Sequence, residues 1–175
     1  MPILQCAAEQ ICNQNKNIWW NFYIPVVETT EKYLREITTS YCFKPELVPS
    51  ADRYKLFEKT DIAIAASGTV TAELAIMHVP TIVIYRMNPF TEFLVRIFVK
   101  IKWASLVNIL LKKSVYPELL GNNATPENIA MWVKRLLQDK EKSKMISDLK
   151  RADKLWTRGG KSPAKLIAAD ILKSK

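Results

Sequence analysis

The fold of this chain is decided by residues Ile62–Ala75, whose sequence is Ile-Ala-Ile-Ala-Ala-Ser-Gly-Thr-Val-Thr-Ala-Glu-Leu-Ala. An apolar run, Ile62–Ile64, is followed by a turn of small residues and then by an alanine-rich helical pattern that ends near His78. A second apolar run, Pro80–Tyr85, comes directly afterwards. This order predicts a strand, a turn, a short helix and a second strand, which is the repeating unit of a parallel α/β sheet.

The turn between the first strand and the helix has the composition of a phosphate-binding site. Ser67, Gly68 and Thr69 open a helix N-terminus, where unpaired backbone N–H groups and the helix dipole favour an anion. Glu73 lies about one turn further along, where its carboxylate can accept hydrogen bonds from the hydroxyls of a sugar. The same residues also suit a purely structural role, in which the turn only caps the helix and Glu73 only favours its dipole.

The composition indicates a folded, basic protein of one domain. The 175 residues are 49% hydrophobic and 25% charged. The net charge of +9 indicates an anionic partner, which is nucleic acid, an acidic lipid surface or a phosphorylated ligand. Cys6, Cys12 and Cys42 lack the spacing of metal ligands and suit a reducing compartment. We expect neither a metal nor a cofactor.

The rest of the chain alternates between strand and helix patterns, which predicts an α/β fold with a Rossmann-like, doubly wound parallel sheet. Beside the central unit, strands are expected at 18–24, ending at Pro25, and at 46–48. Helices are expected at 1–16, 29–38 with Thr30 as a cap, 52–59 and 87–102, and another begins with Thr125 as its cap and Pro126 in its first position. The helix at 1–16 should have one apolar face, made by Ile3, Leu4, Ala7, Ala8 and Ile11. Two basic helices, separated at 158–160, end the chain. We expect a Rossmann-like, nucleotide-binding domain over 1–137 and basic C-terminal helices over 138–175.

The N-terminal pattern departs from a complete Rossmann-like half, which normally begins with a strand and a phosphate-facing loop. Here the first pattern is a helix, so we expect the first strand to be missing from a shortened protein or to be supplied by another chain. No signal peptide is apparent at the start of the sequence. The most apolar stretch, 93–111, is interrupted by Arg96, Lys100 and Lys102, so no transmembrane helix is expected.

Several motifs, the first of which lie within the central unit, occur in a characteristic order. They are Ala66-Ser67-Gly68-Thr69, Thr71-Ala72-Glu73, Pro80-Thr81-Ile82-Val83-Ile84-Tyr85-Arg86, Ser105-Leu106-Val107-Asn108-Ile109-Leu110, Tyr116-Pro117-Glu118-Leu119-Leu120, Ala124-Thr125-Pro126-Glu127-Asn128 and Gly159-Gly160. From about Tyr54 onward, this series resembles lipid-A-disaccharide synthase, a glycosyltransferase family of the GT-B type with two facing Rossmann-like domains. The sequence departs from the family pattern at Ala72, Thr81 and Val107, where the family has Leu, Met and Pro.

The resemblance implies a reaction and a site. The family transfers 2,3-diacylglucosamine from its UDP derivative to 2,3-diacylglucosamine 1-phosphate, giving lipid A disaccharide 1-phosphate and UDP. This chain would match the C-terminal, donor-binding half, and the acceptor-binding domain with its general base would be absent. The resemblance places the diphosphate at Ser67, Gly68 and Thr69 and the ribose at Glu73, with Arg86 and Asn108 near the donor. It also implies a cytoplasmic protein, peripheral on the inner membrane, that works with a separate N-terminal half or as a homo-oligomer.

Two surfaces allow more than one interpretation. The segment 93–103 has a helical apolar pattern, made by Phe93, Leu94, Ile97, Phe98, Ile101 and Trp103, with basic residues off that face. It suits a helix that packs on the core and equally a helix that lies on an acidic membrane surface. The basic C-terminus mixes lysines with acidic residues and has no nucleic-acid-binding motif, so we expect no nucleic acid partner. The alternative to a glycosyltransferase half is a remnant that binds a nucleotide or a partner without turnover.

Overall fold

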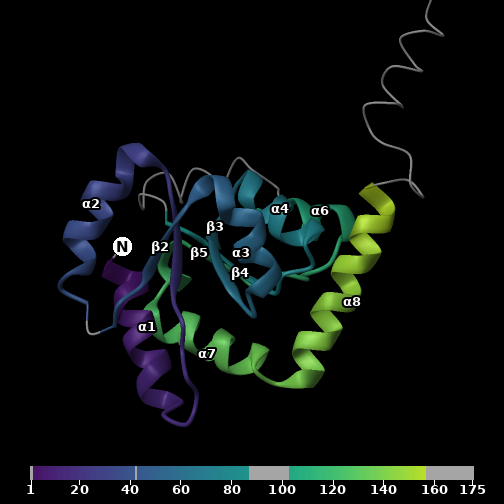
Figure 1. Cartoon of the computed structure of the whole chain (residues 1–175). Coiled ribbons are helices and arrows are strands. Elements are labelled where there is room, and N and C mark those ends of the chain that lie inside the picture. Colours follow the sequence, from purple (N-terminus) through teal and green to yellow (C-terminus); the bar gives the residue numbers. More distant parts are fainter. Residues whose placement is uncertain (1, 42, 87–102, 157–175) are drawn as a thin grey trace, which may run out of the picture.

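The computed structural model describes residues 2–41, 43–86 and 103–156, in which parallel strands lie at the centre and helices surround them (Figure 1). Strands β1 (Tyr23–Val26) and β2 (Glu46–Pro49) form one parallel pair, with Tyr23 opposite Glu46. Strands β3 (Ala63–Ala66), β4 (Thr81–Tyr85) and β5 (Glu118–Leu120) form a parallel sheet in that order. The mixed α/β class and the parallel pairing predicted from the sequence are therefore confirmed.

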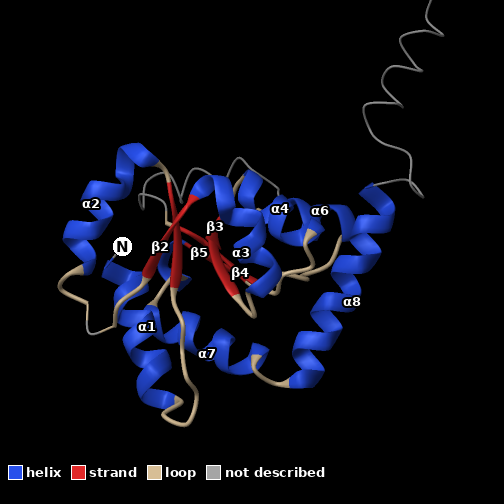
Figure 2. Cartoon of the chain, viewed as in Figure 1, coloured by secondary structure: helices blue, strands red, loops and turns tan. Residues whose placement is uncertain are grey.

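Helices separate the strands along the chain (Figure 2). They are α1 (Pro2–Gln14), α2 (Glu28–Thr38), α3 (Arg53–Lys59), α4 (Thr69–Ile76), α6 (Leu106–Leu111), α7 (Pro126–Leu136) and α8 (Asp139–Trp156), with short 3₁₀ turns at Ser50–Asp52 and Gly121–Asn123. The helices expected at 1–16, 29–38 and 52–59 are thus present with small shifts of their ends. The helix expected at 87–102, and the one after 158–160, lie outside the described residues.

The strand connections match the two sides of a doubly wound sheet, whose usual order is 3-2-1-4-5-6. The pair β1–β2 corresponds to strands 2 and 3, and β3–β4–β5 corresponds to strands 4, 5 and 6. Strand 1 of that order lies between these two groups, and none of the described strands occupies its place. The carboxyl end of β2 leads into the turn before α3, and the carboxyl end of β3 leads into the turn before α4.

The first strand differs from the prediction, because it begins at Tyr23 and continues through Pro25 instead of ending there. The N–H of Glu46 donates to the carbonyl of Phe22 (2.8 Å). Main-chain groups of alternate residues point to the same edge of a strand, so those of Phe22, Ile24 and Val26 point toward β2. Pro25 then faces away from β2, where its missing N–H interrupts no bond of the pair. Trp20 precedes the strand and packs against the core, with its ring stacked on that of Phe22.

Two predicted helix caps have different outcomes. Thr30 is not a cap, because α2 begins one turn earlier after Val27 and the Thr30 hydroxyl donates back to the Val27 carbonyl (3.1 Å). Thr125 is a cap, as predicted, and its hydroxyl oxygen accepts a hydrogen bond from the N–H of Asn128 (3.2 Å). Pro126 follows in the first position of α7, where its missing N–H breaks no helical bond.

One main hydrophobic core joins the elements from α1 to α8. The apolar face predicted for α1 is buried and packs on α7, which lies beside it in Figure 1. The core residues include Ala7 and Ile11 of α1, Ile82 and Val83 of β4, Ile129 and Val133 of α7, and Met145, Leu149 and Ala152 of α8. The first part of the basic C-terminal region therefore packs into the same core as the sheet. Among the described helices, none has the length and apolar character needed to span a membrane.

Candidate functional site

A pocket lies at the carboxyl ends of β1, β2 and β3. Its volume is about 310 Å³. It is lined by Pro25 of β1, Ser50 after β2, Arg53 and Phe57 of α3, and Thr69, Val70 and Glu73 of α4. Because helices that follow parallel strands begin at the same edge of the sheet, α3 and α4 direct their first turns to this pocket. Ligands in open α/β sheets bind in this kind of position.

The Ser67 turn leaves the N-terminus of α4 without a side-chain cap. Gly68 occupies the cap position with an extended backbone (φ 162°, ψ −165°), and no side chain hydrogen-bonds to the first N–H groups of the helix. The hydroxyl of Thr71 instead donates to the Gly68 carbonyl (2.7 Å). The structure therefore contradicts the interpretation in which Ser67 or Thr69 caps the helix through its side chain.

Gly68 has no close neighbour that requires a glycine. A Cβ placed on Gly68 would meet no described atom within 4 Å, and the extended backbone is open to any residue. On the side that a Cβ would occupy, the space above the turn therefore holds no atom of the described residues. An open approach to uncapped N–H groups is the geometry that anion-binding turns share.

The Glu73 carboxylate lies in the pocket and is held by Arg53. Nε of Arg53 donates to Oε2 of Glu73 (2.8 Å), and Nη2 donates to Oε1 (3.2 Å). Both side chains remain about 30% exposed, with Arg53 at 30% and Glu73 at 27%. The hydrogen bonds from Arg53, opposed by partial burial, lower the pKa of Glu73 below its usual value, so the carboxylate is ionised at neutral pH.

Arg53 was not among the predicted site residues. Its Nη1 donates to the Ser50 carbonyl (2.9 Å), its Nη2 donates to the Tyr54 hydroxyl (3.1 Å), and its guanidinium carbon lies 4.5 Å from the centre of the Tyr54 ring. The sequence feature that could have indicated Arg53 as a site residue is its place in the first turn of the helix after β2, at the edge of the sheet where α4 also begins. Nothing in the spacing of 20 residues indicates the pair with Glu73.

Asn108, a predicted donor-site residue, is fully buried and uses its whole amide inside the chain. Its Nδ2 donates to the Tyr116 carbonyl and to Oε1 of Glu118 (both 2.8 Å). Its Oδ1 accepts from the N–H groups of Val115 (2.8 Å) and Tyr116 (2.9 Å). An Asn amide has two donor hydrogens and two strong acceptor positions, so this arrangement leaves no polar group of Asn108 for a ligand.

Glu118 connects Asn108 to the Ser67 turn, a role that the sequence analysis missed. Its carboxylate also accepts from the N–H groups of Ala104 (2.8 Å) and Ser105 (2.9 Å) and from the Ser105 hydroxyl (2.7 Å). The Ala104 carbonyl in turn accepts from the Ser67 hydroxyl (3.1 Å). Asn108 therefore belongs to a network that fixes the 104–108 segment beside the turn.

The remaining predicted residues lie at the edge of the site or outside the described chain. Arg86 directly follows β4 and is exposed. Trp103 is half-buried. The other residues of the predicted membrane face, Phe93, Leu94, Ile97, Phe98 and Ile101, lie outside the described residues.

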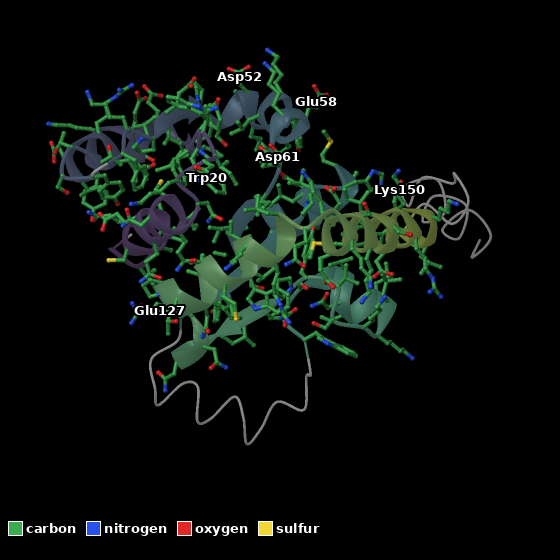
Figure 3. The ribbon with its side chains drawn as sticks, turned by 90° about the horizontal axis from the view of Figure 1, so that it is seen from below. Trp20, Asp52, Glu58, Asp61, Glu127 and Lys150 are labelled. Atoms are coloured by element: carbon green, nitrogen blue, oxygen red, sulfur yellow. The ribbon has the colours of Figure 1, made fainter. Side chains whose placement is uncertain are left out.

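Charged side chains of α8 form ion pairs with the sheet side of the molecule. Nζ of Lys142 lies 2.6 Å from Oδ1 of Asp61, and Oδ2 of Asp148 lies 2.6 Å from Nζ of Lys113. Figure 3 places Asp61 near the α3 region and Lys150 on α8. Mixed charges on an exposed helix face are typical of a solvated surface.

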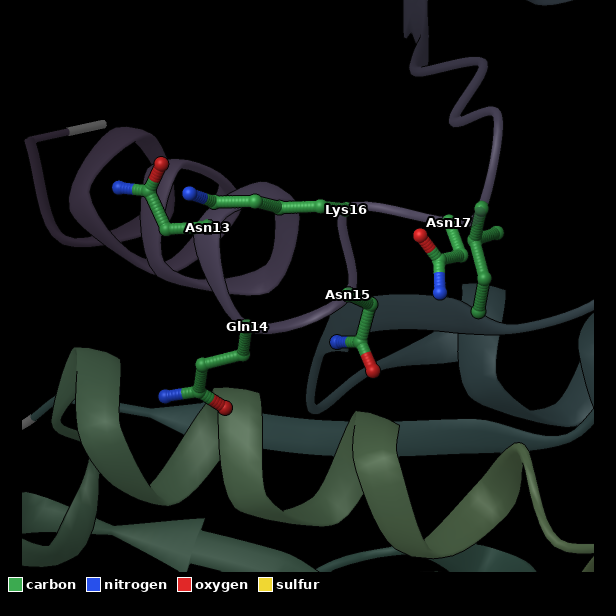
Figure 4. Close-up of a pocket in the computed structure, with 6 residues that line it drawn as sticks. Asn13, Gln14, Asn15, Lys16 and Asn17 are labelled. Atoms are coloured by element: carbon green, nitrogen blue, oxygen red, sulfur yellow. The ribbon is translucent and has the colours of Figure 1, made fainter.

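A second hollow of about 410 Å³ follows the end of α1 (Figure 4). It is lined by Asn13, Gln14, Asn15, Lys16, Asn17 and Ile18, all from one continuous turn of the chain. Its residues are separate from those of the pocket beside α4. The Glu73 pocket therefore combines an uncapped helix N-terminus with a fixed carboxylate, and the second hollow offers neither.

Comparison with known proteins decides the family. The family model described as lipid-A-disaccharide synthetase matches residues 1–171. The chain belongs to this family. Lipid-A-disaccharide synthase of Colwellia psychrerythraea is 40% identical over 142 residues, covering 75% of this chain and 35% of its own length. The enzyme of Nitrosococcus oceani is 35% identical over 143 residues, covering 81% of this chain and 36% of its own.

The match also extends over the whole chain. Lipid-A-disaccharide synthase of Rickettsia felis is 30% identical over 181 residues, covering 100% of this chain and 44% of its own length. The chain thus spans less than half the length of the curated relatives that it matches. The relatives' name describes a glycosyltransferase of lipid A biosynthesis, and the resemblance found in the sequence motifs is confirmed.

Proposed function

We propose that this chain is the donor-binding half of a glycosyltransferase of lipid A biosynthesis. The reaction transfers 2,3-diacylglucosamine from its UDP derivative to 2,3-diacylglucosamine 1-phosphate and releases UDP. The family membership supports the reaction class. The observation that carries the site is the shared pocket, in which the uncapped N-terminus of α4 and the Glu73 carboxylate lie side by side.

In this proposal, the diphosphate of the donor binds at the Ser67 turn. The backbone N–H groups of Gly68, Thr69 and Val70 direct their positive ends toward the negative charge that develops on the leaving UDP. The exposed side chain of Arg86, at the end of β4, adds a positive charge at the same edge of the sheet. No metal and no cofactor takes part, because these groups supply the neutralising charge.

The ribose of the donor binds at Glu73. A carboxylate that is ionised at neutral pH accepts hydrogen bonds from neighbouring sugar hydroxyls, and Glu73 lies one helical turn from the proposed diphosphate site. Asn108 supports the site without contacting the donor, since its amide is fully used in holding the 104–108 segment.

Calorimetric titration with UDP tests the site. Glu73→Ala should weaken binding by about 1–3 kcal/mol, the effect of leaving hydrogen bonds to a charged group unmade. Glu58→Ala is the matched control, because Glu58 is an exposed glutamate of the neighbouring α3 outside the pocket (Figure 3). Equal affinities of the wild type and the Glu73 variant would show that this assignment is wrong.

The acceptor substrate binds, in this proposal, to residues outside this sequence. Glycosyl transfer requires donor and acceptor to be held in line, and the chain spans less than half of its relatives' length. A separate N-terminal half would complete the site. β1 and β2 form one parallel pair, β3, β4 and β5 form another sheet, and no described strand joins the two.

A radiolabelled-donor assay separates this proposal from its alternative, a remnant that binds without turnover. The chain alone should form no disaccharide, and addition of a separately expressed N-terminal half should restore turnover above a Glu73→Ala control. Turnover by the chain alone would contradict its assignment as half an enzyme. Binding of UDP without turnover in any mixture would favour the remnant.

We also propose that the protein lies on the cytoplasmic face of the inner membrane through residues 93–103. Acylated substrates partition into the bilayer, and the apolar pattern flanked by Arg96 and Lys100 suits an acidic surface. Flotation with anionic vesicles should show salt-sensitive binding that Phe98→Glu abolishes. Unchanged flotation of that variant would assign the segment to the protein core.

A further inference from the structure

We propose that Arg53 is a positioning residue of the nucleotide site, which holds the Glu73 carboxylate for a pair of ribose hydroxyls and so selects a ribonucleotide over a 2′-deoxyribonucleotide. This inference rests on the proposed function, since it deepens the role of Glu73. Arg53 acts through Glu73, and both side chains line the same pocket.

The ion pair fixes the carboxylate in two ways. Each Glu73 oxygen receives one N–H from Arg53, at 2.8 Å and 3.2 Å, so the carboxylate cannot rotate without losing a bond. An ionised carboxylate has about four acceptor positions on its two oxygens, and the Arg53 fork uses one on each. The Tyr54 hydroxyl is a weaker third partner of the carboxylate. The acceptor capacity that Arg53 and Tyr54 leave unused remains for ligand hydroxyls.

Arg53 is itself held too firmly to serve as a mobile anion-binding group. Its guanidinium makes four hydrogen bonds, two to Glu73, one to the Ser50 carbonyl and one to the Tyr54 hydroxyl, out of five possible N–H donors. It also lies against the Tyr54 ring, 4.5 Å from its centre. These contacts come from α3 and from the turn after β2, so Glu73 of α4 is held by a different part of the fold.

A fixed carboxylate matches a cis-diol, because two neighbouring hydroxyls can donate to it together. A nucleotide without the 2′-hydroxyl loses one of these bonds and leaves an acceptor of a partly buried carboxylate without its partner. Sites built to hydrogen-bond a hydroxyl reject analogues that lack it. A carboxylate that rotates freely adapts to one hydroxyl as well as to two, so removal of Arg53 should remove this selectivity.

The experiment compares UDP with 2′-deoxy-UDP by calorimetry on the whole chain. The wild type should bind UDP about 10-fold or more tightly than the deoxy analogue, the effect of one hydrogen bond to a charged group. Arg53→Met should bring this ratio close to one. Lys55→Met is the matched control, because Lys55 lies on the same helix and pairs with Asp52 instead of Glu73, and it should keep the wild-type ratio.

A pH series gives a second readout, which a merely structural arginine would not move. The hydrogen bonds from Arg53 are the main cause that lowers the pKa of Glu73, so without Arg53 that pKa should rise toward its ordinary value. UDP affinity of Arg53→Met should therefore begin to fall at a higher pH than that of the wild type as the solution is acidified. Identical pH profiles would contradict the proposal.

The outcomes separate this inference from the proposed function. Absence of UDP binding by the wild type would overturn both. Binding of UDP with an unchanged ribose selectivity in Arg53→Met would overturn the role of Arg53 and leave the nucleotide site in place. If Arg53→Met does not fold, Arg53→Lys decides by the same ratio, because lysine keeps the charge and lacks the two-pronged fork.

Discussion

Replacement of Asn108 by alanine should strongly destabilise the protein. The side chain supplies partners to the N–H and the carbonyl of Tyr116, a residue with no exposed surface. The N–H of Val115 would keep its second bond, to the Lys113 carbonyl (3.0 Å), so two buried main-chain groups lose their partner. At about 1–3 kcal/mol for each unpaired buried group, the free energy of unfolding should fall by about 2–6 kcal/mol. This is a large part of the stability of a typical domain, about 5–15 kcal/mol.

Urea unfolding followed by far-UV circular dichroism measures this loss. With a denaturant dependence of about 2 kcal/mol per molar urea, the midpoint of Asn108→Ala should fall by about 1 M or more. Asn128→Ala is the matched control, because that amide makes one exposed hydrogen bond, to the Asn123 carbonyl (2.9 Å), and should lose less than about 1 kcal/mol. Equal losses in the two variants would refute the reasoning. A variant Asn108→Ala that keeps its stability but loses UDP binding would indicate a direct contact with the donor.

Three smaller perturbations test other parts of the structure. Thr125→Ala removes the cap of α7 and should lower the free energy of unfolding by about 1 kcal/mol, whereas an unchanged midpoint would show that the cap contributes nothing. Tyr116→Phe removes the hydrogen bond to the Val79 carbonyl (3.0 Å) and should lower the free energy of unfolding by about 1–2 kcal/mol in the same assay. An unchanged value would indicate that another group replaces the hydroxyl as partner of that carbonyl. The pKa of Glu73 is lowered in the folded state, so its pair with Arg53 stabilises the protein above the ordinary pKa of 4.5 and loses this effect as the pH falls through the lowered value. The difference in unfolding free energy between the wild type and Glu73→Gln should accordingly shrink on acidification below that pH, and a difference that stays constant would contradict the assignment.

Local patterns were sufficient for much of the fold. The run Ile62–Ile64, the small-residue turn and the run Pro80–Tyr85 predicted β3, α4 and β4, because burial on both faces of a parallel strand leaves a continuous apolar stretch. The α1 face and the Thr125 cap were also recognisable, since both depend on residues within a few positions of one another. β5 was missed because three residues are too few for a periodic pattern.

The family could be identified from the order of the motifs, and the position of Glu73 about one turn after Thr69 followed from helix geometry alone. Only the tertiary structure decided what these residues contact. It brings Arg53 to Glu73 across 20 residues of sequence, and it buries Asn108, whose amide bonds to Glu118 and to the main chain of residues 115 and 116. Such pairings depend on how separate helices pack around the sheet. The contacts between side chains of different elements are set by that packing, whereas periodicity and capping are set by neighbours along the chain.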